Sequence, residues 1–413
     1  MKTRTALPAR GRRKEDVLAE LQTFGADDPH YREGRLWSLV YYLDEDYAAF
    51  LGDAYQAFSC ANGLNPTAFK SLKRFENDII ASVADLLHGT PDVCGVLTSG
   101  GTESCLLAVK TYRDLARSQR GVTAPEMVLP VTAHVAWFKA SEYFGVKVRL
   151  LPLWDYRVPG VTSISADIHK FGYAAKGAST ITYRNLELLK HQMFVYQDWP
   201  GGVFASPALL GTRPGGAYAA AWAAMQHFGR SGYRDLARRT TRAFDRMRKG
   251  IEKMPELYVM GEPSGPLLGY GSRDPGVNIF AVGDQMDARG WKINRLQNPD
   301  GLHAMITAQH LDVMDDYLRD LKEAVAAVKA HPELARAGSA ATYGLMSHIP
   351  LRGMVRQKVL DLFAQMYRAG GQDLDLHADQ APESGLKGQV NALVNRLAQW
   401  YVERQQQKGS GPR

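Results

Sequence analysis

The sequence contains few cysteines. Its 413 residues include only Cys60, Cys94 and Cys105. An odd number of cysteines without metal-ligand spacing argues against a disulfide framework and against a zinc site. We therefore expect free or buried thiols in a reducing compartment, a cytoplasmic location and no bound metal.

Long apolar runs are also missing. No window reaches the roughly eighteen consecutive apolar residues that a membrane-spanning helix needs. The first residues, MKTRTALPARGRRKEDVLAEL, are basic but lack the apolar core of a secretory signal, and their later half has an amphipathic helical pattern. We expect no membrane-spanning segment.

The positive charge is not concentrated in one place. The formal net charge of +7 is spread along the chain, apart from one short cluster at residues 10–14. A nucleic-acid-binding protein usually gathers its basic residues on one patch or helix. The pattern therefore predicts no nucleic-acid partner, and it is compatible with an anionic substrate.

The common nucleotide-binding signatures are absent. The stretch TSGGTES, residues 98–104, lacks the lysine of a P-loop and the spaced glycines of a dinucleotide fingerprint. It does place Gly100 and Gly101 between a strand pattern and a helix pattern, where backbone N–H groups can bind a phosphate. A Gly-Gly turn capped by threonine is also common in ordinary loops, so the motif alone leaves both interpretations open.

Strand and helix patterns alternate through the first half of the chain. Helical spacing of apolar residues occurs at 69–89, 102–120 and 137–145, and strand-like runs occur at 93–98, 126–134, 146–153 and 160–165. This alternation predicts an α/β fold with a mainly parallel sheet.

The pattern changes at about Arg234 to long amphipathic helices. Between them lie two strand-like pieces, LYVMG at 257–261 and GVNIFAVG at 276–283. We therefore predict an N-terminal segment at 1–65, a large cofactor-binding domain at 66–233 and a smaller α+β C-terminal domain at 234–413.

The stretch SADIHKFGYAAKGAS, residues 165–179, carries two lysines in a region poor in charge. A lysine near a strand end is costly to bury unless its amine has a function, and burial lowers its pKa so that it can attack a carbonyl. This segment alone favours the ordinary interpretation, a surface Lys170 after a strand and a core His169 with its hydrogen bonds satisfied. A phosphate-binding turn upstream and a reactive lysine downstream, on an α/β scaffold, together favour a pyridoxal phosphate enzyme.

Four motifs together closely resemble the sphingosine-1-phosphate lyase family, in the group II decarboxylase branch of fold-type I pyridoxal phosphate enzymes. They are SGGTES, VTAH, GVTSISADIHKFGYAAKGAS and DWPGGVFASPALLGTRPGG, within a match from about Leu36 to about His310. The resemblance implies cleavage of the C2–C3 bond of a phosphorylated sphingoid base, sphingosine 1-phosphate. The products would be a long-chain aldehyde and phosphoethanolamine.

The resemblance also implies a cofactor site. Lys170 would bind the aldehyde of pyridoxal 5'-phosphate and act as the catalytic lysine, while Gly101 and Thr102 would hold the cofactor phosphate. His134 would stack on the pyridine ring, and His169 would be a further cofactor contact.

Other residues are implied at the substrate site and at a subunit interface. Lys176 and Tyr41 would bind the substrate phosphate, although Tyr41 on its own reads as an ordinary aromatic core residue. Thr212, in GTRPGG, would reach the cofactor phosphate of the neighbouring subunit. The resemblance assigns both Tyr41 and GTRPGG to the partner's active site and so implies a homodimer with shared sites.

One motif departs from the family pattern. Asn62 and Asn65 lie in ANGLNP, where the family usually shows NPLHP, so Asn65 replaces a histidine of the substrate-phosphate site. An amide donates a hydrogen bond but cannot carry charge or shuttle a proton. The departure concerns substrate preference rather than the cofactor.

Two alternatives remain open. An amino-acid decarboxylase of the same branch would use the same cofactor site to release carbon dioxide instead of an aldehyde. A non-catalytic protein would keep the fold and the dimer for interaction alone, and would form no borohydride-reducible bond with the cofactor.

We predict that the natural chain contains additional residues between Leu153 and Trp154. Parallel strands at 146–153 and 160–165 need a crossover of a dozen or more residues, and only WDYRVP separates them. The family has there a stretch on the order of 70 residues, about two βα units, which holds the aspartate that pairs with the pyridine nitrogen. We expect the intact mass to exceed 45.7 kDa by several kilodaltons, and the backbone to be interrupted between these two residues. A continuous peptide bond with a matching mass would favour the non-catalytic alternative.

Overall fold

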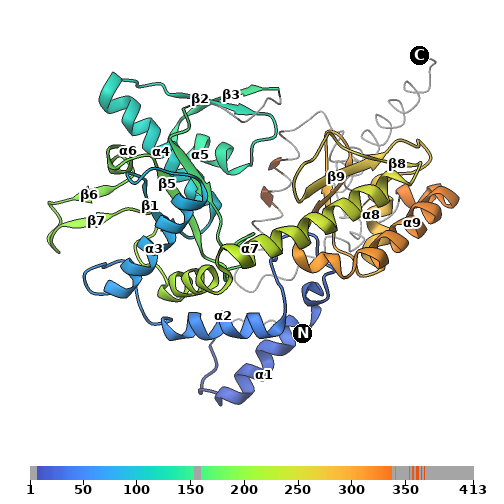
Figure 1. Ribbon diagram of the computed structural model, residues 1–413, viewed down its shortest axis with the longest axis horizontal. Coiled ribbons are helices and arrows are strands. Elements are labelled where there is room, and N and C mark those ends of the chain that lie inside the picture. Colours follow the sequence, from blue (N-terminus) through green and yellow to red (C-terminus); the bar gives the residue numbers. More distant parts are fainter. Residues whose placement is uncertain are drawn as a thin grey trace, which may run out of the picture. The chain divides into compact units, whose positions relative to one another are not determined.

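The computed structural model describes residues 7–152 and 160–336, together with eight single residues between 340 and 367. Leu153 and Trp154, with the junction predicted between them, lie outside the described residues, as does most of the chain after 336. The chain divides into two compact units (Figure 1). We call Tyr41–Ala237 the site unit, and Met1–Val40 with Arg238–Arg413 the terminal unit.

The site unit contains a three-stranded sheet in the order β1-β5-β4. Its strands are β1 (Cys94–Thr98), β4 (Ser163–Ala166) and β5 (Ser179–Tyr183). β5 runs antiparallel to both neighbours, so β1 and β4 run in the same direction. The α/β class is confirmed, but these two pairings differ from the predicted parallel ones. The reason is that the connection from β4 to β5 contains no helix and returns the chain directly, as antiparallel neighbours allow.

A second, separate pair of strands does have the predicted parallel arrangement. β2 (Glu126–Pro130) pairs with β3 (Lys147–Leu151) through the intervening helix α5 (Ala136–Phe144). Val128 and Leu150 of this pair and Ile164 of β4 are exposed apolar residues. Both sheets of this unit therefore leave apolar side chains uncovered in the described residues.

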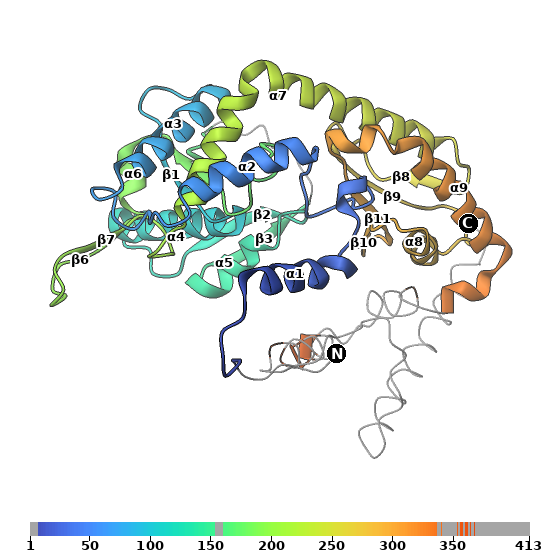
Figure 2. The same cartoon turned by 90° about the horizontal axis from the view of Figure 1, so that it is seen from below.

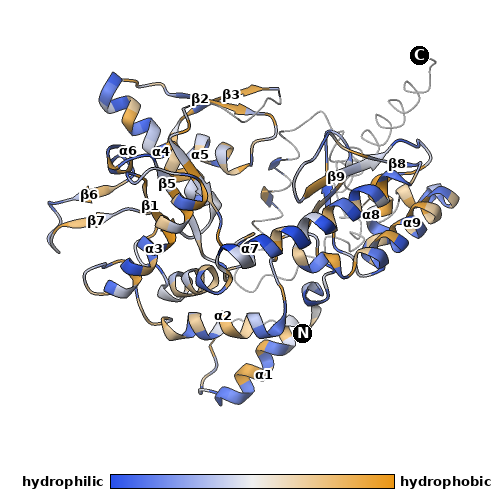
Figure 3. Ribbon diagram, viewed as in Figure 1, coloured by the Kyte–Doolittle hydropathy of each residue, from blue (hydrophilic) through white to orange (hydrophobic). Residues whose placement is uncertain are grey.

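Helices cover the three-stranded sheet because each has one apolar face. α3 (Lys70–Leu86) buries Leu72, Ile79 and Val83, at helical spacing. α4 (Gly101–Arg120) packs Leu107 with Ile181 of β5 in one cluster. Figure 3 shows apolar and hydrophilic residues alternating along these helices, as this packing requires.

The remaining elements of the site unit follow in chain order. They are α2 (Glu45–Ala57), α6 (Leu186–Lys190), the hairpin of β6 (Phe194–Tyr196) and β7 (Phe204–Ser206), and α7 (Gly215–Glu252), which continues beyond Ala237. Figures 1 and 2 both show the β6–β7 hairpin projecting from the rest of the unit. Its large apolar residues, including Phe194, Trp199 and Val203, are exposed.

The terminal unit is an antiparallel sheet packed with helices around one core. The strand order is β10-β11-β9-β8, formed by Asn294–Leu296, Gly301–Met305, Leu267–Ser272 and Leu257–Val259. The helices that contribute to this core are α8 (Ile279–Ala288), α9 (Met314–Ala330) and the part of α7 after Ala237, whereas α1 (Lys14–Phe24) buries none of its residues. Trp37 is fully buried in the core and stacks on His310 at 4.1 Å.

The prediction of a strand at GVNIFAVG was wrong. Residues from Ile279 onward form α8, because the Asn278 side chain accepts hydrogen bonds from the N–H groups of Phe280 and Ala281. This N-cap satisfies donors that the first helical turn would otherwise leave unpaired. An apolar run of this length does not by itself distinguish a strand from a buried helix.

Two expectations from composition can be compared with the described residues. None of their helices is long and apolar enough to span a membrane. The three cysteines are free, and Cys60 is exposed while Cys94 and Cys105 are partly buried.

Candidate functional site

The site begins at one edge of the β1-β5-β4 sheet. Thr98 at the end of β1 pairs with Ser179 at the start of β5, and Ala166 at the end of β4 pairs with Thr180. The turn after β1 and the loop after β4 must therefore meet at this edge. The Ser104 hydroxyl, fully buried, lies 2.7 Å from the Thr98 hydroxyl and 3.2 Å from the Ser179 hydroxyl, and so ties the three segments together.

Lys170 lies in the loop after β4 and forms an ion pair with Asp167. The Lys170 Nζ and the Asp167 Oδ2 are 2.6 Å apart, and the lysine side chain is 44% exposed. Burial opposes the charge of Asp167, but the hydrogen bond and charge of Lys170 outweigh it and keep the pKa of Asp167 below its ordinary value. Asp167 was not among the predicted site residues. The available signal was an acid three residues before a lysine in a stretch poor in charge.

The Asp167 carboxylate also lies against Gly101, at the start of α4. A Cβ placed on Gly101 would come within 2.7 Å of Oδ2 and 2.8 Å of Oδ1 of Asp167. The loop with the lysine and the glycine turn are thus in direct contact through Asp167 and Gly101. Thr102 follows on the first turn of α4 and is exposed.

His169 is held next to the same turn. Its Nδ1 accepts a hydrogen bond from the Ala178 N–H at 3.2 Å, and a Cβ on Gly100 would lie 3.5 Å from its Cε1. Burial, and secondarily the charges of nearby lysines, lower the pKa of His169 despite the opposing charge of Asp167. The ring is therefore neutral at pH 7, and its Nδ1 serves as an acceptor.

Lys176 and Tyr41 meet in the same chain. The Lys176 Nζ lies 5.2 Å from the centre of the Tyr41 ring, which also packs edge-on against Phe171 at 5.0 Å. Desolvation lowers the pKa of Lys176, and the positive charge of Lys170 lowers it further. The Lys176 residue as a whole is exposed, but its amine lies against the Tyr41 ring, and this contact partly removes water from it and so lowers its pKa. Two positive groups and an aromatic hydroxyl thus lie close together.

The position of Tyr41 differs from its predicted contribution to a partner's site. It precedes α2, and the Tyr47 hydroxyl of α2 donates a hydrogen bond to the Tyr173 carbonyl at 3.0 Å. This bond holds the segment beside the loop of Lys176 in the same chain. Tyr173 itself has φ of 55°, so the loop turns sharply at this residue.

His134 lies between β2 and α5, two residues before the helix begins. Its Nδ1 accepts a hydrogen bond from the Ala136 N–H at 3.1 Å, and the residue is exposed. This bond fixes the ring at the N-terminus of the helix. Among the described residues, the hydrogen bonds of His134 are to the N–H groups of Ala136 and Trp137, and none joins it to Lys170.

Asn62 and Thr212 meet in a second group, to which the described contacts do not join Asn65. The Asn62 Nδ2 donates to the Thr212 hydroxyl at 3.3 Å, so the predicted substrate loop and the GTRPGG turn are neighbours. The Asn65 Oδ1 instead accepts from the N–H groups of Thr67 and Ala68 and holds its own turn.

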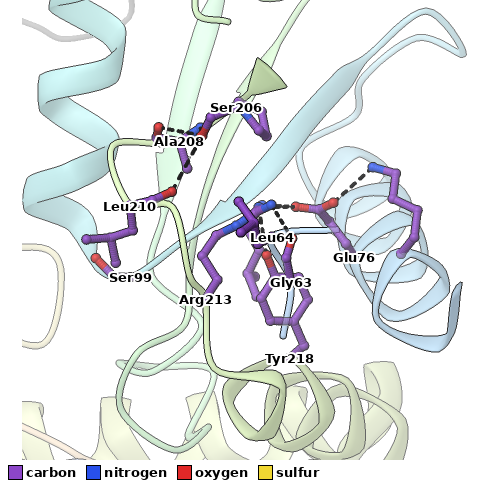
Figure 4. Close-up of polar contacts among 12 residues, drawn as sticks. Gly63, Leu64, Glu76, Ser99, Ser206, Ala208, Leu210, Arg213 and Tyr218 are labelled. Atoms are coloured by element: carbon purple, nitrogen blue, oxygen red, sulfur yellow. Dashed lines mark hydrogen bonds and ion pairs between the residues drawn. The ribbon is translucent and has the colours of Figure 1, made fainter. Parts of the chain in front are cut away.

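Two buried carboxylates, Glu103 and Glu76, support these loops, and Figure 4 shows the contacts of Glu76. Glu103, on the first turn of α4, accepts from both the N–H and the hydroxyl of Ser99 at 2.7 Å, and from the Leu209 N–H at 2.9 Å. Glu76, on α3, accepts from the Leu97 N–H at 2.9 Å. Sequence patterns did not identify these residues because the partners Leu97 of Glu76 and Leu209 of Glu103 are distant in the chain.

Similar proteins have been characterised. No family model matches the chain. A sphingosine-1-phosphate lyase from rice (Oryza sativa subsp. japonica) is 34% identical over 440 aligned positions, covering 87% of this chain and 81% of the relative. The alignment is longer than the whole 413-residue chain. The relative therefore carries residues without a counterpart here.

Solved structures give the same picture. The sphingosine-1-phosphate lyase of Burkholderia pseudomallei superposes with a TM-score of 0.76 at 31% identity, covering 87% of this chain and 96% of that chain. The glutamate decarboxylase of Lactobacillus brevis reaches a TM-score of 0.67 at 16% identity, covering 79% of this chain and 95% of that chain, a similarity of fold alone.

We predict that Gly101→Ala displaces the Asp167 carboxylate from Lys170, because the new methyl group would overlap both carboxylate oxygens. A partly exposed ion pair contributes up to about 1 kcal/mol, so its loss should accelerate acylation of the Lys170 amine by up to about fivefold. Acetic anhydride labelling of the cofactor-free protein, read by peptide mass spectrometry, measures this rate.

Gly100→Ala is the matched control, since its methyl group would make only ordinary contact with His169. Asp167→Asn sets the rate expected without the ion pair. Equal labelling of the wild type and Gly101→Ala, with faster labelling of Asp167→Asn, would show that the carboxylate does not move.

Proposed function

The chain belongs to the sphingosine-1-phosphate lyase family, and we propose that it is a pyridoxal phosphate-dependent aldehyde-lyase acting on phosphorylated sphingoid bases. It would cleave the C2–C3 bond to a long-chain aldehyde and phosphoethanolamine. The observation that carries this proposal is the meeting of Lys170 with the glycine turn at one sheet edge, in a chain with relatives at 30% identity or more.

The residues at this edge fit the cofactor. Gly100 and Gly101 carry no side chain where α4 begins, and the first N–H groups of a helix favour an anion. Lys170, with an exposed amine, would hold the cofactor aldehyde, and Gly101 with Thr102 its phosphate. When bound, the cofactor supplies an electron sink for the breaking carbon–carbon bond.

The two histidines would serve as contacts of the cofactor. His169 is neutral through burial, and its Nδ1 is engaged by the Ala178 N–H. His134 is oriented by the Ala136 N–H.

Lys176 and Tyr41 would bind the substrate phosphate, with Asn62 and Asn65 as further polar contacts. An ammonium group beside an aromatic hydroxyl supplies both charge and hydrogen bonds to a phosphate. The lowered pKa of Lys176 means that this charge is sensitive to pH and to the phosphate itself.

An assay for aldehyde tests the proposal directly. The purified protein, loaded with pyridoxal 5'-phosphate, should convert a phosphorylated sphingoid base to a long-chain aldehyde without release of carbon dioxide. Release of carbon dioxide from an amino acid would support the decarboxylase alternative. The glutamate decarboxylase of Lactobacillus brevis, at 16% identity, resembles this chain in fold alone. Absence of both products and of borohydride-reducible cofactor would support the non-catalytic alternative.

We further propose a cytoplasmic homodimer. Exposed apolar patches on a projecting hairpin are typical of surfaces covered by another protein, and Phe194, Trp199 and Val203 are 53–73% exposed. The neighbouring GTRPGG turn is the segment that would reach the partner's cofactor phosphate through Thr212. A second copy of this chain is therefore the proposed occupant.

The additional residues between Leu153 and Trp154 remain part of this proposal. The longer alignment with the rice relative supports them, as do the two separate sheets with exposed Val128, Leu150 and Ile164. Strands inserted there would also supply the acid for the pyridine nitrogen.

Lys170→Ala should abolish the absorbance band of the lysine-bound cofactor and reduce aldehyde formation by more than about a thousandfold. The amine is needed for a covalent bond, and it is not part of the packed core. Circular dichroism and the melting temperature should stay close to wild type. Turnover near the wild-type rate would remove Lys170 from the centre of the site.

Lys176→Ala should keep the cofactor band and raise the KM for a phosphorylated base about tenfold or more, as loss of a charged contact does. In the wild type the Lys176 amine loses its proton as the pH rises through its pKa, which lies below the ordinary value of 10.5. Because the neutral amine binds a phosphate less well, the KM should already rise with pH below 10.5. Lys176→Arg, charged throughout this range, should flatten the rise. Equal losses for an unphosphorylated analogue would contradict the phosphate role.

Mixed dimers test the shared site. Lys170→Ala and Thr212→Tyr proteins should each be inactive, but equal mixing should restore about a quarter of wild-type activity, because half of the dimers contain one undamaged site. Native mass spectrometry of the mixture verifies subunit exchange. No recovery despite exchange would show that Thr212 acts within its own chain.

A further inference from the structure

We propose that Arg213 and Glu76 are positioning residues, which hold the loop of Asn62 and the turn of Thr212 against the end of β1. The inference rests on the proposed function, because it concerns the loops assigned to the two phosphates. It is argued from a buried network that joins four segments of the site unit (Figure 4).

Arg213 forms hydrogen bonds to the loop of Asn62 through both its side chain and its main chain. Its side chain is only 9% exposed, its guanidinium donates to the Tyr218 hydroxyl at 2.9 Å, and a second nitrogen donates to the Gly63 carbonyl. The Gly63 N–H in turn donates to the Arg213 carbonyl at 2.9 Å. The planar fork of an arginine presents a separate nitrogen to each acceptor, whereas a lysine has a single nitrogen to place between them.

The buried charge of Arg213 is balanced by Glu76. The Arg213 Nη1 lies 3.9 Å from the Glu76 Oε1, and the glutamate side chain is 6% exposed. The same oxygen accepts from the Leu97 N–H at 2.9 Å, near the end of β1. Glu76 therefore connects Arg213 to the strand that leads into the glycine turn.

Lys73 is the other cation beside Glu76, but it cannot connect the loops. It lies on the same helix, three residues before Glu76, with its Nζ at 2.9 Å and its side chain 45% exposed. Because Lys73 itself is largely exposed and pairs within its own helix, this contact does not fix the position of another segment. Of these two cations, only Arg213 reaches another loop.

The surrounding backbone leaves little space for a shift. The Asn62 Oδ1 accepts from the N–H groups of Leu64 and Arg213, while its Nδ2 donates to Thr212. A Cβ on Gly215 would lie 2.8 Å from the Phe58 carbonyl oxygen. The positions of Asn62 and Thr212 thus depend on the same contacts that Arg213 makes.

Arg213→Met, Glu76→Gln and Lys73→Met form the test set. Two ratios are measured for each variant. The first compares the KM for a phosphorylated base with the KM for its unphosphorylated analogue. The second compares the affinity of the cofactor-free protein for pyridoxal 5'-phosphate with its affinity for pyridoxal. Arg213→Met should lower the preference for the phosphorylated partner in both ratios by about tenfold, the loss expected for a charged hydrogen-bonding group. Glu76→Gln should act in the same direction, and Lys73→Met should match the wild type.

Two further variants separate positioning from stability. Removing one member of a buried pair destabilises a protein strongly, whereas replacing both members is often tolerated. Glu76→Gln combined with Arg213→Met should therefore recover the melting temperature lost in the single variants but keep the lowered ratios. Arg213→Lys should also keep them lowered, since it restores charge without the fork.

The proposal is overturned if the double variant or Arg213→Lys recovers both ratios. It is also overturned if Arg213→Met, measured at temperatures below its melting temperature where it is folded, has the same two ratios as the wild type. These outcomes differ from failure of the proposed function. A wild type that forms no aldehyde would contradict the lyase assignment, while the binding ratio for pyridoxal 5'-phosphate against pyridoxal would still test the role of Arg213.

Discussion

The site depends on the insertion of β5 between β1 and β4. Because β5 is antiparallel to both, the ends of β1 and β4 and the start of β5 lie at one edge. A glycine turn leaves that edge into α4, and a lysine loop leaves it toward β5. If either pairing were parallel, one of these segments would lie at the opposite edge of the sheet. The contacts between the two segments therefore depend on the directions of the three strands.

The loop after β4 is held from outside as well as from its ends. The Tyr47 hydroxyl binds the Tyr173 carbonyl, and the Tyr233 hydroxyl binds the Gly172 carbonyl at 2.9 Å. A Cβ on Gly172 would lie 2.4 Å from the Ile168 carbonyl oxygen, so the turn closes tightly here. Lys170 and Lys176, on either side of this turn, thereby keep separate surroundings, one beside a carboxylate and one beside an aromatic ring.

Local patterns predicted the elements that carry the site, and long-range contacts escaped them. The helix from Lys70 to Leu86 and the strand, glycine turn and helix around Gly101 follow from apolar spacing and are observed. The α8 helix was missed because its cap at Asn278 was read as part of a strand. The contact of Asp167 with Gly101 and that of Glu76 with Leu97 join residues 66 and 21 positions apart, and no periodicity encodes such pairings.

Gly101 meets two separate demands at one backbone position. It opens the helix at the anion-binding edge, and it leaves room for the Asp167 carboxylate. A larger residue that can still begin the helix would overlap the Asp167 carboxylate. A single substitution of Gly101 is therefore unfavourable unless residue 167 becomes smaller at the same time. In the evolution of this family, positions 101 and 167 are therefore expected to covary, and a larger residue at 101 should occur only in lineages that have already given up the acid.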